Sequence, residues 1–141
     1  MPEGIKNLSI KMLENRTSET GAENIFTNDL IYEITSFGKV VLTKEDRADG
    51  ILAGVIKSMR IDAISRRDSH SSLERRVIVT LNLKLTDQTG RVIWSAKDFS
   101  ASEDYIVSSD KQTTERNRRE AIKILSKRLA EKVYNRLTDN F

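Results

Sequence analysis

The stretch "RVIVTLNLKLTDQTGRVIWSAKDF", residues 76–99, decides the fold that we predict. Its first half alternates apolar and polar residues, which is the pattern of a strand with one buried face. The apolar positions are Val77, Val79, Leu81, Leu83 and Leu85. "DQTG" then turns the chain, and Val92, Trp94 and Ala96 alternate in a second strand that continues through Phe99. Two long antiparallel strands therefore form the centre of the predicted sheet.

The flanking sequence predicts two further strands and two helices. Leu8, Ile10 and Met12 alternate in a first strand. A long strand runs from Ile51 to about Ser65, and its predicted inner face carries Val55, Met59, Ile61 and Ala63. Apolar residues at helical spacing between Phe26 and Phe37 predict one helix, ended by Gly38. A second apolar row between Ile122 and Leu137 predicts a long amphipathic helix that runs to the end of the sequence. Thr20 with Glu23, and Ser109 with Gln112, have capping-box spacing.

The resulting order is β-α-β-β-β-α, which predicts an α+β fold. We expect a two-layer sandwich in which two helices cover one face of a mostly antiparallel, four-stranded sheet. A chain of 141 residues is one domain by the usual size rule, and we expect residues 1–141 to form it. The polar residues 98–112 are predicted to connect the last strand to the last helix.

Composition excludes several classes of protein. The chain has no cysteine, so disulfides and thiolate chemistry are excluded, and no apolar run reaches the roughly 18 residues of a membrane span. Its only histidine, His70, lies in a polar hairpin tip without a nucleophile and carboxylate that would complete a catalytic set. No nucleotide-binding glycine motif is present. We therefore expect no enzyme activity, no cofactor and no metal.

Two groups of cations are candidates for binding an anion. Arg66 and Arg67 precede the hairpin tip and Arg75 and Arg76 follow it, so the four guanidiniums could meet across the hairpin and hold a phosphate or carboxylate. Charged hairpin ends also serve solubility and edge protection, and this alternative stays open. The last helix carries a basic row beside its apolar face: Arg116, Arg119, Lys123 and Lys127.

The basic row has two interpretations, a ligand site or an ordinary solvated helix flank. Nucleic acid is the generic partner of such a row, but no aromatic residue is interleaved with it for base stacking. The formal net charge is also only +3. We therefore expect no nucleic-acid partner.

The order of motifs resembles the LptE (RlpB-related) lipopolysaccharide-assembly lipoproteins. The resemblance rests on "PEGIKNLSIKMLENRT", "ADGILAGVIKSM", "RVIVTLNLKLTDQTGRVIWSAKDFSASEDY" and "TERNRREAIKILSKRLAEKVYNRL", in that order. It covers nearly the whole chain. The family fold, two helices on a four-stranded sheet, agrees with the fold predicted above.

The resemblance implies a function that periodicity does not show. Such proteins are lipid-anchored at the periplasmic face of the outer membrane. They plug and help assemble a large β-barrel, LptD, assist lipopolysaccharide transfer to the outer leaflet, and are not enzymes. This chain has no signal sequence and no lipobox cysteine, so the anchor is expected in a preceding segment. By similarity, Arg66, Arg67 and Lys111 are candidate lipopolysaccharide contacts, and residues 98–112 are expected to face the barrel lumen or the glycolipid.

Two alternatives from other classes stay open at this stage. A periplasmic lipoprotein that activates a cell-wall synthase would have a similar size and fold, but it would show no affinity for lipid A. A small nucleic-acid-binding module would show a steep salt dependence of binding.

Overall fold

The computed structural model describes residues 1–2, 4–64 and 73–139. The strands are β1 (Asn7–Ile10), β2 (Glu14–Asn15), β3 (Val41–Leu42), β4 (Gly50–Ile64), β5 (Glu74–Asp87) and β6 (Val92–Ile106). The helices are α1 (Ala22–Thr35), the short 3-10 helix η1 (Glu45–Arg47) and α2 (Lys111–Asp139). The α+β class and the order of the principal elements are therefore as the sequence predicts.

The sheet has six strands and is mixed. Its order is β3-β1-β4-β5-β6, and β2 pairs separately with β4. The three long strands β4, β5 and β6 are antiparallel, whereas β1, β2 and β3 join in parallel. The predicted four-stranded sheet lacked β2 and β3. Each of these strands has two residues, which is too short for any periodicity to appear in the sequence.

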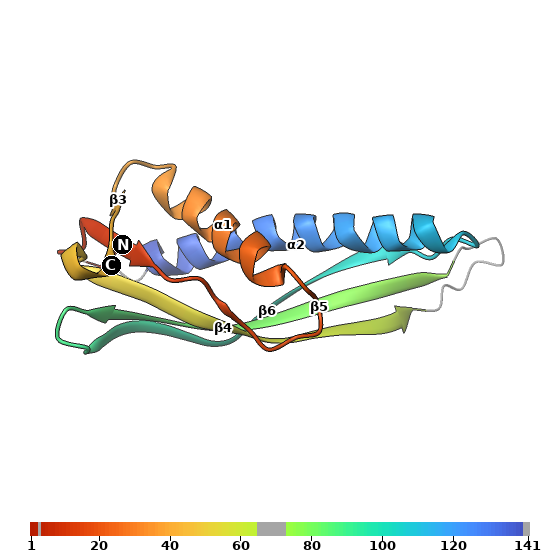
Figure 1. Ribbon diagram of the computed structural model, residues 1–141, viewed down its shortest axis with the longest axis horizontal. Coiled ribbons are helices and arrows are strands. Elements are labelled where there is room, and N and C mark those ends of the chain that lie inside the picture. The colour runs from red at the N-terminus through yellow and green to blue at the C-terminus, as the bar shows by residue number, and fades with distance from the viewer. Residues whose placement is uncertain (3, 65–72, 140–141) are drawn as a thin grey trace.

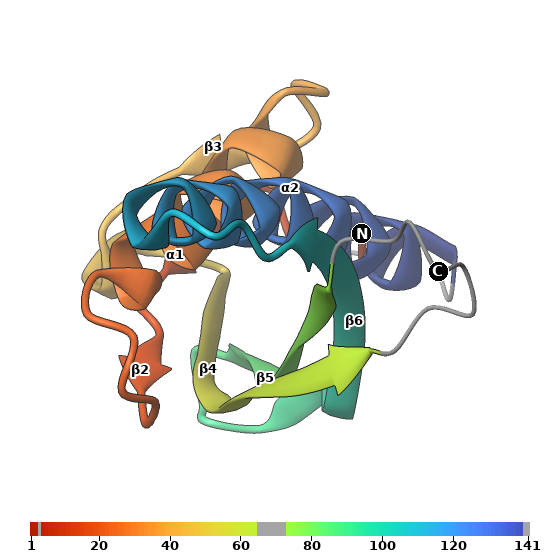
Figure 2. The same cartoon turned by 90° about the vertical axis from the view of Figure 1, so that its right-hand side faces the viewer.

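The two helices cover one face of this sheet and give an elongated molecule (Figure 1). Both termini lie at one end, which we call the terminal end. The opposite, distal end carries the end of β4, the start of β5 and the start of α2. α2 runs along the long axis, while α1 covers only the part nearer the termini. Seen from the distal end, the long strands curve beneath α2 (Figure 2).

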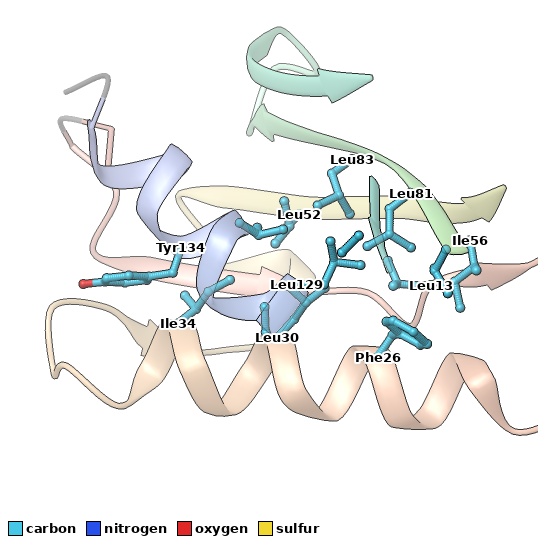
Figure 3. Close-up of a cluster of buried hydrophobic side chains, with 14 of the residues drawn as sticks. Leu13, Phe26, Leu30, Ile34, Leu52, Ile56, Leu81, Leu83, Leu129 and Tyr134 are labelled. Atoms are coloured by element: carbon cyan, nitrogen blue, oxygen red, sulfur yellow. The ribbon is translucent and has the colours of Figure 1, made fainter. Parts of the chain in front are cut away.

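The hydrophobic core lies between the helices and the inner face of the sheet (Figure 3). All five predicted apolar residues of β5 are buried: Val77, Val79, Leu81, Leu83 and Leu85. They face a buried row on α2 that includes Ile122, Leu125, Leu129, Val133 and Leu137, and a row on α1 that includes Phe26, Leu30 and Ile34. The helical and strand periodicities of the sequence therefore converge on one core.

The predicted connection at residues 98–112 is wrong over its first nine residues. β6 continues to Ile106 and pairs with β5 from Phe99 to Ile106. The strand is hard to recognise because its outer face is polar and its inner face buries only Ala101 and Tyr105 beyond Phe99. Only residues 107–110 connect β6 to α2.

The predicted inner face of β4 is partly wrong, because a β-bulge changes which residues face inward. Ile56 pairs with Leu81 and Ser58 with Thr80, so Lys57 is an extra residue. Met59 and Ile61 lie opposite the buried Val79 and Val77, as expected of the inner face, but the Ile61 side chain is exposed. An extra residue shifts the alternation by one, so Leu52 and Ile56 are buried before the bulge and Val55 is not.

Both predicted capping boxes are also wrong. α1 begins after Gly21, which has a φ of 88° and no side-chain cap, and Glu23 instead accepts a hydrogen bond from Asn15 Nδ2 at 2.8 Å. α2 is capped by Asp110, whose carboxylate accepts hydrogen bonds from the backbone N–H of Gln112 at 3.1 Å and the hydroxyl of Thr113 at 2.8 Å. A carboxylate at this position satisfies a free donor and complements the helix dipole.

At Gly54 the backbone of β4 lies very close to β5. A Cβ at this position would lie 2.4 Å from the backbone oxygen of Asn82 and 2.5 Å from Leu83 Cδ2. We expect Gly54→Ala to lower the free energy of unfolding by about 1–3 kcal/mol, because a backbone atom cannot yield as a side chain can. Urea denaturation measures the difference.

Gly50→Ala is the matched control on the same strand. Its Cβ would meet only the methyl groups of Ile5 and Leu85, each at 3.1 Å, so it should cost clearly less than Gly54→Ala. Equal losses for the two variants would contradict the close approach at Gly54.

Candidate functional site at the distal end

The distal end gathers cations from β5 and α2. Arg75 and Arg76 open β5, and Lys111 opens α2. The two segments are joined near their ends, where Val107 N–H donates to the Leu73 carbonyl at 2.8 Å. Arg66 and Arg67 lie outside the described residues, so their predicted meeting with Arg75 and Arg76 stays a prediction.

Arg75 and Arg76 have different surroundings because neighbouring residues of a strand face opposite sides of the sheet. Arg76 lies on the outer face, and its Nε donates to Asp104 Oδ1 of β6 at 2.8 Å. This hydrogen bond and the charge of Asp104 raise the pKa of the Arg76 guanidinium. Arg75 lies on the inner face, in register with Ala63 and Tyr105, and is exposed. Arg76 is thus partly neutralised, whereas Arg75 forms no ion pair with another described residue.

Three cations of α2 surround one shallow hollow of about 530 Å³. Lys111, Arg116 and Arg119 line it together with Gln112 and Glu115. All three cations are exposed. With three positive charges against one carboxylate, the hollow suits an anion, and the positive dipole end of α2 adds to this preference.

The remaining members of the predicted row have acidic neighbours. Lys123 Nζ lies 3.5 Å from Glu120 Oε1. Lys127 lines a groove of about 400 Å³ between the helices, together with Asp29, Glu33 and Glu131. Burial and the nearby charge of Glu131 raise the pKa of Glu33. The predicted row is therefore divided, and its unbalanced positive charge lies near the start of α2, at Arg116 and Arg119.

Two other arginines of α2 hold the fold together. Arg118 pairs with Glu19 in the loop before α1 and with Glu115, 2.9 Å away. Arg128 donates to the Ser102 carbonyl at 2.8 Å and to Glu103 at 3.1 Å, both on β6. Sequence reasoning missed these roles, because Glu19, Ser102 and Glu103 lie far from the two arginines in the sequence and no local pattern reveals the contacts.

The described residues offer no sign of a metal centre or a membrane span. They contain no group of three or more His, Cys, Asp or Glu side chains that could hold a metal ion. None of the described helices combines the length and the apolar composition needed to cross a membrane. His70 lies outside the described residues.

Comparison with known families identifies the protein class. The model of the LptE family, described as lipopolysaccharide-assembly, matches residues 5–137. The chain belongs to the LptE family. The match extends from the residues just before β1 almost to the end of α2, so it includes every strand and both long helices. The family resemblance seen in the sequence is thereby confirmed.

Solved structures share the fold of this LptE-family chain. Lipoprotein B from Nitrosomonas europaea matches with a TM-score of 0.67 at 11% identity, over 96% of this chain and 84% of that one. The rare lipoprotein B from Shewanella oneidensis gives 0.64 at 12% identity, over 96% of both chains. A minor lipoprotein from Acinetobacter baumannii gives 0.63 at 15% identity, over 96% and 92%. A search of curated proteins finds no match.

At these identities the solved structures show the fold alone. They confirm that the LptE-family chain has two helices on a mixed sheet. The distal cations are therefore assigned from their own geometry and charge.

Because Asp110 caps α2 at the base of the distal site, we expect the free energy of unfolding to depend on pH. The Thr113 hydroxyl and the Gln112 N–H lower the pKa of the Asp110 carboxyl. A lowered folded-state pKa stabilises the fold above the unfolded pKa of about 3.9, and this contribution is lost as the pH falls through the folded value. We expect Asp110→Ala to unfold at lower urea concentration than the wild type at pH 7, with a smaller gap below about pH 3.5.

Asp46→Ala is the control, because Asp46 is an acidic residue in the first turn of η1 without a side-chain hydrogen bond among the described residues. Its denaturation midpoint should differ little from the wild type at either pH. A gap for Asp110→Ala that stays constant from pH 7 to pH 3 would contradict the capping role of the carboxylate.

Proposed function

We propose that this chain is a non-enzymatic lipopolysaccharide-assembly lipoprotein at the periplasmic face of the outer membrane. It plugs an LptD-like β-barrel, helps that barrel to assemble and assists lipopolysaccharide transfer to the outer leaflet. The observation that carries the proposal is the LptE-family match over residues 5–137. A lipid anchor on a preceding segment would hold the terminal end at the membrane.

The elongated shape supports a plug. The terminal and distal ends lie at opposite ends of the long axis (Figure 1). An anchor at the terminal end would therefore leave the basic distal end free to extend away from the anchor and into the lumen of a barrel. No hinge is needed for this, because α2 and the three long strands extend along the same axis and share one core.

The uncovered sheet face also supports a plug. No helix packs on the outer face of β4, β5 and β6 (Figure 2). Ion pairs lie across it, including Lys57–Asp98 at 2.7 Å, Arg60–Asp62 at 3.1 Å and Arg76–Asp104 at 2.8 Å. A polar, charge-balanced face of this kind fits a wet contact with the polar lumen of a barrel better than a dry, obligate interface.

The distal cations would meet the phosphates of lipid A. Lys111, Arg116 and Arg119 surround an open hollow, and Arg75 is free of ion pairs among the described residues. Charge-assisted hydrogen bonds between such groups and phosphate oxygens are short and strong. Arg66 and Arg67, which lie outside the described residues, are part of the same proposed contact. No step here breaks a covalent bond, so the protein would act by binding and positioning.

Co-purification from the outer membrane tests the partner. We expect tagged full-length protein, extracted in detergent from its native membrane, to retain a large β-barrel in equal stoichiometry, identified by mass spectrometry. Recovery of a peptidoglycan synthase without a barrel would overturn the proposal and favour a role in cell-wall synthesis. Recovery of no membrane protein at all would also overturn it.

Charge reversal tests the distal site. We expect Lys111→Glu, Arg116→Glu and Arg119→Glu together to weaken binding of lipopolysaccharide at least tenfold, because each lost charged hydrogen bond costs about 1.5–3 kcal/mol. Binding to immobilised lipopolysaccharide, followed by surface plasmon resonance at physiological salt, measures the change.

The matched control reverses three other exposed cations: Lys44, Arg47 and Lys84. It changes the net charge by the same amount but lies outside the distal hollow, so its affinity should stay within about threefold of the wild type. Equal losses in the two triple variants would show that overall charge governs binding and would overturn the assignment of the distal site.

A further inference from the structure

A second basic hollow lies beside the last turns of α2. It has a volume of about 740 Å³, and β6 and α2 form its walls. Lys97 comes from β6, and Lys132 and Arg136 come from α2. The polar side chains of Ser95, Ser100 and Asn135 complete the lining on both sides. This hollow, which we call the β6 hollow, is separate from the distal site.

The charge of the β6 hollow is unbalanced in favour of an anion. Lys97, Lys132 and Arg136 form no ion pair with any described residue. Of the two carboxylates in its lining, Asp98 is already bound by Lys57 Nζ at 2.7 Å. Lys97 also acts on Asp98 through its charge. The lining therefore has three cations against two carboxylates, Asp98 and Asp139, and Asp98 is shared with Lys57. An anion bound between the cations would balance the remaining positive charge.

An aromatic ring holds one of these cations in place. The Arg136 guanidinium lies over the Phe99 ring, 5.7 Å from its centroid. Phe99 is partly buried and packs against the core. A guanidinium that already contacts a ring has less side-chain entropy to lose when it binds an anion.

A strained β-bulge shapes the other wall. Ala96 pairs with Leu83 and Phe99 with Leu81, so Lys97 and Asp98 both lie opposite Asn82. Asp98 has a φ of 53°, and it is the one described residue other than glycine with a positive φ. Asn82 Oδ1 accepts the Asp98 N–H at 2.8 Å, which supports this backbone. Backbone conformations of this kind occur preferentially at functional sites, and bulges often redirect side chains there.

We propose that the β6 hollow binds the acidic saccharide part of lipopolysaccharide, through the carboxylate or phosphate groups of its sugars. Lys97, Lys132 and Arg136 hold the anionic groups, and Asn135 with the two serines hydrogen-bonds sugar hydroxyls. The hollow's lining is mostly polar, so acyl chains have little apolar surface to contact there. This inference rests on the proposed function and adds a second contact to it.

The two basic hollows are separate contacts. Arg119 of the distal hollow and Lys132 of the β6 hollow are 13 positions apart on the same helix, which is on the order of 20 Å along the axis at 1.5 Å per residue. Because 13 positions are not a whole number of turns, the two residues also lie on different sides of α2. The β6 hollow is therefore tested with a ligand of its own.

An oligosaccharide without lipid A separates the two contacts, because it lacks the lipid A phosphates proposed for the distal hollow. The probe is the anionic core oligosaccharide released from purified lipopolysaccharide by mild acid hydrolysis, titrated into full-length protein by isothermal calorimetry. We expect Lys132→Gln with Arg136→Gln to weaken its binding at least tenfold. The control, Arg47→Gln with Lys84→Gln, removes the same charge elsewhere and should change binding less than twofold. Both variants should remain folded, with thermal unfolding close to that of the wild type, since all four side chains are exposed and Arg136→Gln removes only one surface contact with Phe99.

Several results would overturn the β6 hollow as a saccharide site. Unchanged binding in the Lys132 and Arg136 variant would do so, and so would an equal loss in the control. Undiminished binding of the same oligosaccharide after dephosphorylation and carboxyl reduction would show that anionic groups are not recognised. Binding of an acidic peptide such as hexaglutamate as tight as that of the saccharide would assign the hollow to a protein segment instead.

Failure of the β6 hollow as a saccharide site can be distinguished from failure of the proposed function. If wild-type protein retains its barrel partner but saccharide binding does not depend on Lys132 and Arg136, the β6 hollow alone is refuted. If the wild type retains no barrel, the plug itself is refuted, whatever the titration shows.

Discussion

The packing of β5 against α2 is the contact on which the rest of the structure depends. The inner face of β5 is apolar from Val77 to Leu85, and it is buried without a break beneath the helices. β5 is also the central long strand, so its register determines the positions of β4 on one side and β6 on the other. A shift of one residue would move this whole apolar row to the solvent face. The inner face, the helix layer and the polar outer face all follow from that constraint.

The free edge of the sheet at β6 is protected by α2. β6 is the last strand of the sheet, and its outward carbonyls need partners. Arg128 donates to the carbonyl of Ser102 and Asn117 to that of Ile106, at 2.8 and 3.0 Å. The helix thus covers both the inner face and the distal half of the exposed edge. Nearer the terminal end this cover is replaced by the bulge at Asp98 and the β6 hollow, where polar groups remain available.

Local patterns predicted the parts of the fold that repeat. The alternation in β5 and the apolar row of α2 are regular over many residues, and both were correct. The distal half of β6 was missed because it is recognisable only through its pairing with β5. Val55 was wrongly placed on the inner face of β4, because the extra residue Lys57 shifts the alternation of inward and outward side chains by one position. The distal site was partly predictable: Lys111, Arg116 and Arg119 were named as cations, but their shared hollow depends on the three-dimensional course of α2.

The cations of α2 show why charge in a sequence does not by itself identify a site. Nine Lys and Arg residues lie between Lys111 and Arg136, yet the structure divides them by their neighbours. Arg118 and Arg128 are committed to carboxylates on other elements, and Lys127 lies in a groove rich in carboxylates. The cations left over are concentrated in two places, the distal hollow and the β6 hollow. Because the chain as a whole carries only +3, the proposed binding of anions would depend on these local imbalances rather than on net charge. Separate contacts of this kind would each be weak enough to release an extended anionic lipid, which the proposed function requires.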